Sequence, residues 1–119
     1  MRKRSVKNKY FDENIVAALK ALSIPLKTFD NYEVYFGKNK RHESIYTHIS
    51  KERHRFKVND IKAIPKILSN KNCLQKDEKK KIFRNYVGER PKKNAKLKYI
   101  KIITCLIKGN REEIETIYL

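Results

Sequence analysis

Residues 99–118 read YIKIITCLIKGNREEIETIY, and this stretch decides the fold. Its first nine residues, Tyr99 to Ile107, are the strongest strand signal in the chain because they are mainly apolar and rich in β-branched side chains. Lys108-Gly109-Asn110-Arg111 predicts a tight turn, and residues 113–118 follow as a second strand. Together these segments predict an antiparallel hairpin.

The register of this hairpin follows from its turn. If Gly109 and Asn110 form a two-residue turn, Thr116 lies opposite Ile103 and Tyr118 lies opposite Lys101 on the same face. Ile114 is expected to share this face with Thr116 and Tyr118 because side chains alternate along a strand. A slip by one residue would invert every face.

Two further strands are predicted by alternating residues. Residues 82–87 alternate before Gly88 and Pro91, and Tyr32, Val34 and Phe36 alternate before Gly37. The first segment joins the C-terminal hairpin in the expected sheet, and the second is a short, half-buried strand.

The N-terminal half is mostly helical in its pattern. Asp12 can cap a helix over residues 13–23, which Pro25 ends. A second helix is expected to begin near Arg41, with Ile45, Ile49 and Phe56 on a narrow core-facing stripe.

A third helical segment is predicted from Ile61 to Leu68. Asn59 or Asp60 can cap it, and Pro65 is expected to kink or divide it. Residues 69–81 are polar and rich in lysine, which predicts a loop.

This order of elements predicts an α+β protein in which N-terminal helices pack on a C-terminal twisted antiparallel β-sheet. The length of 119 residues suits one domain, expected over residues 11–119, preceded by a basic flexible arm at residues 1–10. No repeat and no glycine motif for a cofactor appears in the sequence.

The charge is the strongest indication of a partner. Thirty Lys and Arg residues against 13 Asp and Glu residues give a formal net charge of +17, and they are spread along the whole chain. Such a surface favours nucleic acid or an acidic protein, and phosphate contacts make binding salt-dependent.

No apolar run is long enough to span a membrane and the start does not resemble a secretory signal, so we expect a cytoplasmic protein. Cys73 and Cys105 lack metal-ligand spacing and are expected to be reduced and independent.

The run His48-Ile49-Ser50-Lys51-Glu52-Arg53-His54 carries the groups best suited to acid–base chemistry. On a helix His48 and Glu52 are neighbours, so the carboxylate could orient the imidazole or raise its pKa. The alternative is structural, with His48 at the edge of the core, His54 in solvent and Glu52 in an ion pair.

This run is part of a wider resemblance. The string His48-Ile49-x-x-x-Arg53-His54, followed by residues 60–70 with the pattern DIxxIPxILxN, resembles the phage-associated nucleases of the barnase, EndoU, colicin and RelE-like (BECR) fold. The resemblance covers roughly residues 15–118, and the hairpin lies where that fold would place its sheet. It implies a metal-independent ribonuclease, often a toxin, that needs no cofactor.

The resemblance also implies roles for particular residues. A base would remove the proton of the ribose 2′-hydroxyl, cations would stabilise the phosphorane, and an acid would protonate the leaving 5′-oxygen, giving 2′,3′-cyclic phosphate and 5′-hydroxyl ends. The expected catalytic residues are His48 or His54 for proton transfer, Arg53 or Arg90 for phosphate stabilisation, and Thr116 with Tyr118 for positioning.

A basic patch is expected to hold the RNA. Its members are Arg84, Tyr86, Lys92, Lys93, Lys96, Lys98 and Lys101. One departure from the best-known ribonuclease pattern is that no glutamate is clearly placed on the late sheet as a base, since Glu113 and Glu115 are expected to face away from Thr116.

The sequence thus predicts a toxin-type endoribonuclease with no metal. The alternative is a non-catalytic basic protein that binds nucleic acid or acts as a phage-encoded inhibitor, in which the histidines are incidental. A toxin of this charge also predicts an acidic antitoxin or immunity protein as a partner.

Overall fold

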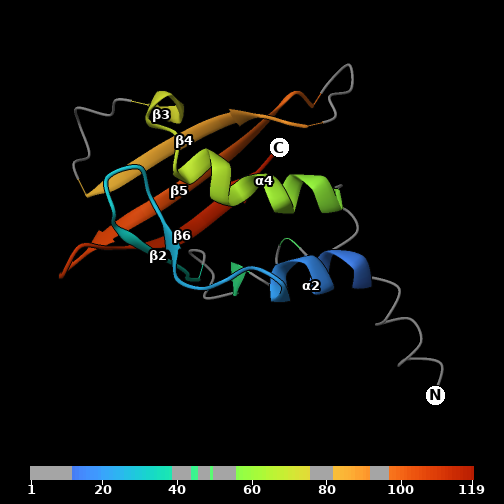
Figure 1. Cartoon of the computed structure of the whole chain (residues 1–119), viewed down its shortest axis with the longest axis horizontal. Coiled ribbons are helices and arrows are strands. Elements are labelled where there is room, and N and C mark those ends of the chain that lie inside the picture. The colour runs from blue at the N-terminus through green and yellow to red at the C-terminus, as the bar shows by residue number, and fades with distance from the viewer. Residues whose placement is uncertain (1–11, 39–43, 46–48, 50–55, 76–81, 92–96) are drawn as a thin grey trace.

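The computed structural model describes residues 12–38, 44–45, 49, 56–75, 82–91 and 97–119. Its elements are α2 (Glu13–Lys20), β1 (Leu26–Lys27), β2 (Glu33–Phe36), α4 (Val58–Leu68), the 3-10 turn η2 (Lys71–Cys73), β3 (Leu74–Gln75), β4 (Phe83–Glu89), β5 (Tyr99–Ile107) and β6 (Arg111–Tyr118). The fold is α+β, as predicted, with the helices early and the longest strands late (Figure 1). None of the helices in these ranges has the length and hydrophobicity needed to cross a bilayer.

The sheet is mixed rather than antiparallel, which corrects the prediction. Its strand order is β1-β2-β6-β5-β4-β3, and β2 runs parallel to β6 while the other neighbours are antiparallel. The N-terminal strands therefore extend one edge of the C-terminal sheet. The prediction missed this pairing because two segments far apart in the sequence carry no local sign of being neighbours.

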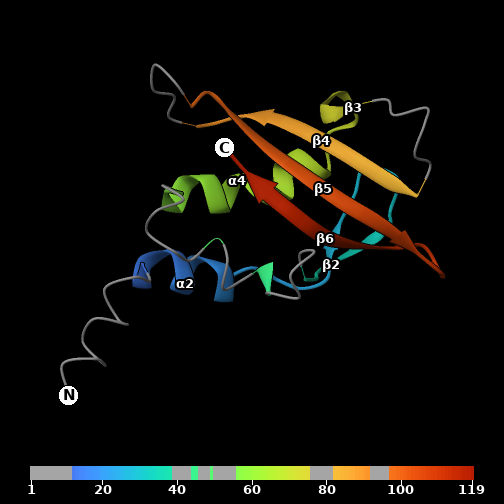
Figure 2. The same cartoon turned by 180° about the vertical axis from the view of Figure 1, so that it is seen from behind.

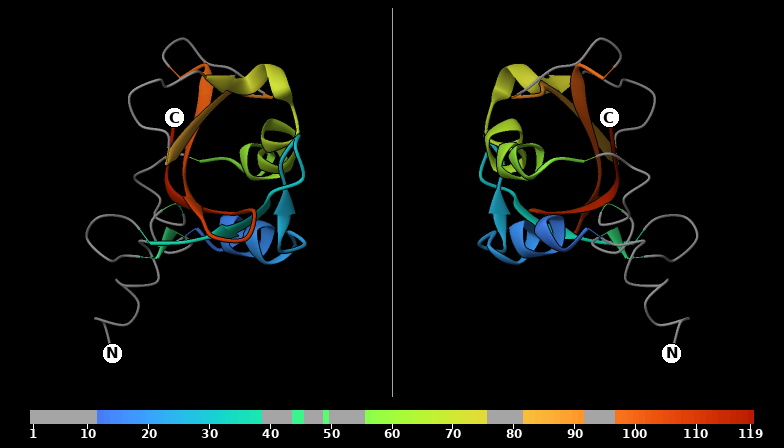
Figure 3. Two further views of the ribbon diagram at one scale, coloured as in Figure 1. Left: turned by 90° about the vertical axis from the view of Figure 1, so that its left-hand side faces the viewer. Right: turned by 90° about the vertical axis from the view of Figure 1, so that its right-hand side faces the viewer.

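The sheet curls around α4, and the helices lie on its inner side (Figure 3). From the opposite side β4, β5 and β6 lie in front of α4, and no helix of the described chain covers them (Figure 2). We call these the inner face and the outer face of the sheet. The core fills the inner face, where Ile100, Ile102 and Ile114 are fully buried.

The C-terminal hairpin has the predicted register only in the half that lies far from its turn. Thr116 pairs with Ile103 and Tyr118 with Lys101, as predicted. The turn, however, has three residues between the paired Ile107 and Arg111, and a bulge follows between Ile103 and Thr104.

The extra residue in this bulge is Glu115, because Thr104 pairs with Ile114 and Ile103 with Thr116. A bulge resets the alternation of side chains. Ile114 therefore points into the core at 0% exposure, and the prediction that it shares a face with Thr116 and Tyr118 was wrong.

The helix α4 begins earlier than predicted. Lys57 is its N-cap residue, and Asp60 lies in the first turn, where its carboxylate accepts the backbone N–H of Lys57 at 2.8 Å. Pro65 does not divide the helix, which continues to Leu68. The hydrogen bond lost at Pro65 is offset by burial of Ile61 and other apolar side chains on this helix.

The other helical predictions fare unevenly. Asp12 caps α2 as predicted, although that helix ends at Lys20. The predicted loop at residues 69–81 instead contains η2 and β3 in its described part. Ile45, Ile49 and Phe56 are buried, in agreement with the predicted stripe. The rest of the predicted second helix and the arm at residues 1–10 lie outside the described residues.

Gly88 lies inside β4, which continues through it to Glu89, although the sequence predicted that the strand would end before it. A Cβ atom at this position would lie 2.5 Å from Cγ1 and 2.8 Å from Cδ1 of Ile67 on α4. Glycine therefore lets the helix approach the strand closely.

Gly88→Ala should lower the free energy of unfolding by about 1–3 kcal/mol because it overpacks the contact with Ile67. Urea unfolding of both proteins measures this. In an Ile67→Ala background, where the clash is removed, the same glycine substitution should cost clearly less. Equal costs in both backgrounds would contradict the proposed contact.

Candidate functional site: the outer face of the sheet

A groove of about 630 Å³ lies on the outer face of the sheet. Its lining residues are Gln75, Asn85, Tyr86, Val87, Tyr99, Lys101, Ile102, Ile103 and Tyr118. They come from β3, β4, β5 and β6, so the groove crosses the strands. We call it the outer-face groove.

Two tyrosines and one lysine dominate its surface. Tyr99 is 47% exposed and Tyr118 is 41% exposed. The Nζ atom of Lys101 lies 5.5 Å from the centre of the Tyr118 ring, within reach of a cation–π contact. The groove therefore combines an aromatic surface with a positive charge, the two features that single-stranded nucleic acids need from a protein.

Thr116 lies beside this groove. It pairs with Ile103, one of the lining residues, and Tyr118 follows two residues later on the same face. Three residues predicted from the sequence, Lys101, Thr116 and Tyr118, thus lie together on the outer face.

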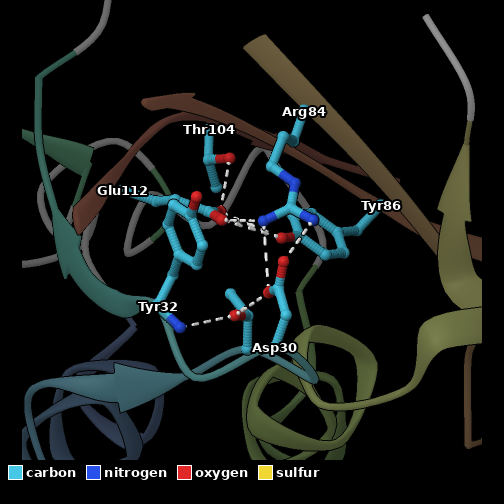
Figure 4. Close-up of polar contacts among 7 residues, drawn as sticks. Asp30, Tyr32, Arg84, Tyr86, Thr104 and Glu112 are labelled. Atoms are coloured by element: carbon cyan, nitrogen blue, oxygen red, sulfur yellow. Dashed lines mark hydrogen bonds and ion pairs between the residues drawn. The ribbon is translucent and has the colours of Figure 1, made fainter. Parts of the chain in front are cut away.

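The inner face carries a different polar cluster (Figure 4). The Glu112 carboxylate is fully buried and accepts hydrogen bonds from three side chains. Its donors are Arg84 Nη1 at 2.6 Å, Tyr86 Oη at 2.9 Å and Thr104 Oγ1 at 2.8 Å. A buried carboxylate is tolerated only when it is paired in this way.

Arg84 joins this cluster to the connection between β1 and β2. Its Nη2 atom lies 2.9 Å from Oδ2 of Asp30, and its guanidinium carbon lies 5.1 Å and 5.2 Å from the ring centres of Phe29 and Tyr32. Burial alone would lower the pKa of Arg84, but hydrogen bonds to Asp30 and Glu112 outweigh it and raise the pKa. Arg84 therefore remains a cation whose side chain is held by structural contacts.

The pKa values of Tyr86 and Asp30 in this cluster also shift. Burial raises the pKa of Tyr86, and the charge of Glu112 raises this pKa further, so the phenol stays protonated and donates. Burial tends to raise the pKa of Asp30, but the hydrogen bonds from Arg84 and Thr28 and the charge of Arg84 outweigh it, and the pKa is lowered.

Arg90 takes part in a separate buried ion pair. Its Nε and Nη2 atoms bind the Asp60 carboxylate at 3.0 Å and 2.7 Å, and Nη1 donates to the carbonyl of Leu97. The residue is only 4% exposed. This arrangement ties the end of β4 to the first turn of α4 and leaves the guanidinium turned away from solvent.

The structure therefore divides the predicted site residues. The polar groups of Arg84 and Tyr86 lie in the inner-face cluster and Arg90 pairs with Asp60, so none of them offers its polar group on the outer face, although Tyr86 is among the residues that line the outer-face groove. Lys98 is exposed just before β5. The remaining predicted residues, His48, Arg53, His54, Lys92, Lys93 and Lys96, lie outside the described residues.

The glutamates of the late sheet also differ from the prediction. Glu112, which is not among the predicted site residues, lies on β6 but faces the helices. Glu113 was expected to face away from Thr116, yet it pairs with Cys105 on the outer face. Burial and the charges of Glu115 and Glu113 raise the pKa of the Cys105 thiol.

The sequence did contain a signal for the inner-face cluster. Arg84 and Tyr86 share a face because they are two residues apart, and Glu112 and Ile114 do so as well. The strand was expected to begin at Glu113, which left Glu112 outside the predicted strand and hid this pattern.

Comparison with protein families, with curated proteins and with solved structures found no match for this chain. Among the residues that the structure describes, no group of three or more His, Cys, Asp and Glu side chains could hold a metal ion.

Glu112→Gln should lower the free energy of unfolding by about 3 kcal/mol, because it removes the buried charge that pairs with Arg84. Its neighbour Glu113 is exposed, so Glu113→Gln is a matched control with an expected change within about 0.5 kcal/mol. Urea unfolding of both variants measures the difference. Similar small effects would show that the cluster contributes little.

Asp30→Asn should remove part of the stability of the protein in a pH-dependent way. The folded-state pKa of Asp30 is lowered, so its carboxylate stabilises the fold above the unfolded pKa of roughly 3.9. This contribution is lost as the pH falls through the folded-state pKa. The stability difference between wild type and variant should therefore be larger at neutral pH than in strong acid, measured by urea unfolding across this range. A difference that does not change with pH would contradict it.

Proposed function

We propose that this protein is a metal-independent endoribonuclease of toxin type that acts on RNA in the cytoplasm and binds it in the outer-face groove. The observation that carries the proposal is that Tyr99, Lys101 and Tyr118 line one groove beside Thr116, on the side of the sheet that no described helix covers. Aromatic rings can stack on bases while a lysine neutralises a phosphate.

The overall charge supports RNA as the partner. A net charge of +17 on 119 residues attracts a polyanion over a wide area and accelerates its association. Each neutralised phosphate releases counterions, which makes the affinity depend strongly on salt. An acidic antitoxin or immunity protein would block the same surface by charge complementarity.

The proposed chemistry is attack by the ribose 2′-hydroxyl on the adjacent phosphorus. A base removes the hydroxyl proton, a cation stabilises the phosphorane, and an acid protonates the leaving 5′-oxygen, which gives 2′,3′-cyclic phosphate and 5′-hydroxyl ends. We propose His48 and His54 for proton transfer and Arg53 for charge stabilisation, from their sequence pattern. Thr116 and Tyr118 would position the substrate.

The described residues nearest this run in the sequence contact the edge of the sheet and the core. The backbone N–H of Ile45 donates to the carbonyl of Gly37, and the N–H of Gly37 donates to the carbonyl of Ile114 on β6. Ile45 and Ile49, on either side of His48 in the sequence, are both fully buried. Ile45 is thus joined through Gly37 to β6, the strand that also carries Thr116.

A second candidate function is RNA binding without catalysis. It is favoured by the absence of carboxylate and imidazole side chains among the described residues that line the groove. The buried carboxylate of Glu112 lies on the other face, where three donors occupy it. In this case the groove would hold RNA and the histidines would have no chemical role.

Wild-type protein incubated with total RNA in excess EDTA should cleave it and leave 2′,3′-cyclic phosphate ends, and a His48→Ala/His54→Ala double variant should lose at least about a hundredfold in rate, the scale of a lost acid–base pair. Sequencing of the new ends after phosphatase treatment identifies them. If wild type binds RNA without cutting it, the binding function replaces the nuclease.

The position of the groove is tested separately with two lysines. Lys101→Gln should weaken RNA binding and reduce the slope of the logarithm of affinity against the logarithm of salt concentration by about 1, as expected for the loss of one phosphate contact. Lys108→Gln makes the same change of charge at the exposed β5–β6 turn and should leave the slope nearly unchanged. Equal effects of the two substitutions would place the RNA elsewhere.

A further inference from the structure

One row of side chains crosses the outer face from the edge strand β3 to β6. Gln75 pairs with Asn85, Asn85 with Ile103, and Ile103 with Thr116. Neighbouring strands are roughly 4.8 Å apart, so the row forms a continuous line across the sheet. Its first three members line the outer-face groove.

The two amides in this row are the uncharged polar groups of the groove best suited to read a base. Each offers N–H donors beside a carbonyl acceptor. Within the described part of the chain, neither side chain makes a hydrogen bond. Gln75 is exposed and Asn85 is half-buried, and both stand at one end of the groove that holds Tyr99 and Tyr118.

The spacing of the two tyrosines favours unpaired bases. Tyr118 lies opposite Lys101, and Tyr99 is two residues from Lys101 on the same face, so the tyrosines are diagonal neighbours on adjacent strands. Such neighbours are separated by roughly 7–8 Å. Successive bases in a duplex strand rise only about 3.4 Å. Bases stacked on both rings therefore cannot remain stacked on each other as they are in a duplex.

We propose that the outer-face groove takes single-stranded RNA and that Gln75 and Asn85 read an adenine in it. This inference rests on the proposed function, because it requires that RNA bind in the groove. An amide side chain matches an amino donor next to a ring-nitrogen acceptor, and it pairs with adenine in this way. Adenine presents that arrangement on its Watson–Crick edge and on its Hoogsteen edge, whereas cytosine presents it on one edge only. The tyrosine rings supply stacking, which is tolerant of sequence, and the amides supply the discrimination.

The test uses short 2′-O-methyl oligonucleotides of adenine, cytosine or uracil in EDTA, because they lack the hydroxyl that cleavage needs. Fluorescence anisotropy should show adenine bound about tenfold more tightly than cytosine or uracil, and all three more tightly than a duplex of the adenine and uracil strands. Gln75→Ala and Asn85→Ala should each reduce the preference for adenine over uracil to less than about threefold and leave the affinity for uracil, which has no amino group, within about twofold.

The control is Asn72→Ala, which removes an exposed amide outside the groove and should keep the full preference. Circular dichroism checks that each variant is folded. If Asn85→Ala is unstable, Gln75→Ala still tests the inference, because Gln75 is exposed and its substitution should not affect folding. Equal binding of the three bases, or an adenine preference that survives in Gln75→Ala, would overturn the inference. In that outcome Lys101-dependent RNA binding would leave the proposed function standing, whereas absence of binding to every oligonucleotide would overturn both.

Discussion

The carboxylate of Glu112 on β6 accepts hydrogen bonds from side chains on β4 and β5, and the packing of the inner face of the sheet depends on these contacts. Arg84 and Tyr86 reach it from β4, and Thr104 reaches it from β5. Arg84 also binds Asp30, which adds the connection between β1 and β2 to the same cluster. Charges with little access to water stabilise a fold only when each has its partners, so these elements must be assembled together. The curl of the sheet thus has a polar anchor as well as an apolar core.

The cluster around Glu112 has a structural role on the inner face, whereas the side chains available to bind a ligand lie on the outer face. Arg84 and Glu112 are a cation and a carboxylate of the kind that nucleases use, yet each already holds several partners on the helix side. On the outer face the amides of Gln75 and Asn85 and the rings of Tyr99 and Tyr118 are presented to solvent in a groove. Side chains without internal partners are the ones that can exchange water for a ligand.

Local patterns in the sequence predicted the local structure well. The cap at Asp12 and the strand over residues 99–107 were confirmed because each depends on neighbouring residues. The pairing of Tyr118 with Lys101 was also confirmed, but only because the bulge at Glu115 offsets the longer turn. The parallel pairing of β2 with β6 was not predicted, since it joins residues nearly eighty positions apart such as Glu33 and Arg111. The cluster around Glu112 was missed for the same reason, as its members come from four separate segments.

For the candidate site, the sequence predicted which residues carry suitable side chains better than it predicted which of them lie on the same face. Thr116, Tyr118 and Lys101 were expected together and do share a face, whereas Arg84 and Tyr86 were expected with them but direct their polar groups to Glu112 on the inner face. Alternation assigns residues to two faces within a strand, but the sequence does not say which face the helices will cover.

The bulge at Glu115 lets one short strand serve both faces. Before it, Glu112 and Ile114 point inward to the cluster and the core. Without the extra residue, strict alternation would continue this inward series to Thr116 and Tyr118, and their side chains would have to fit against α4. With the bulge, Ile117 takes the buried position at 1% exposure and Tyr118 stands on the outer face over Lys101. The bulge costs one pairing between β5 and β6, and in return it places the Tyr118 ring in the outer-face groove. Bulges often occur where a side chain must be redirected in this way.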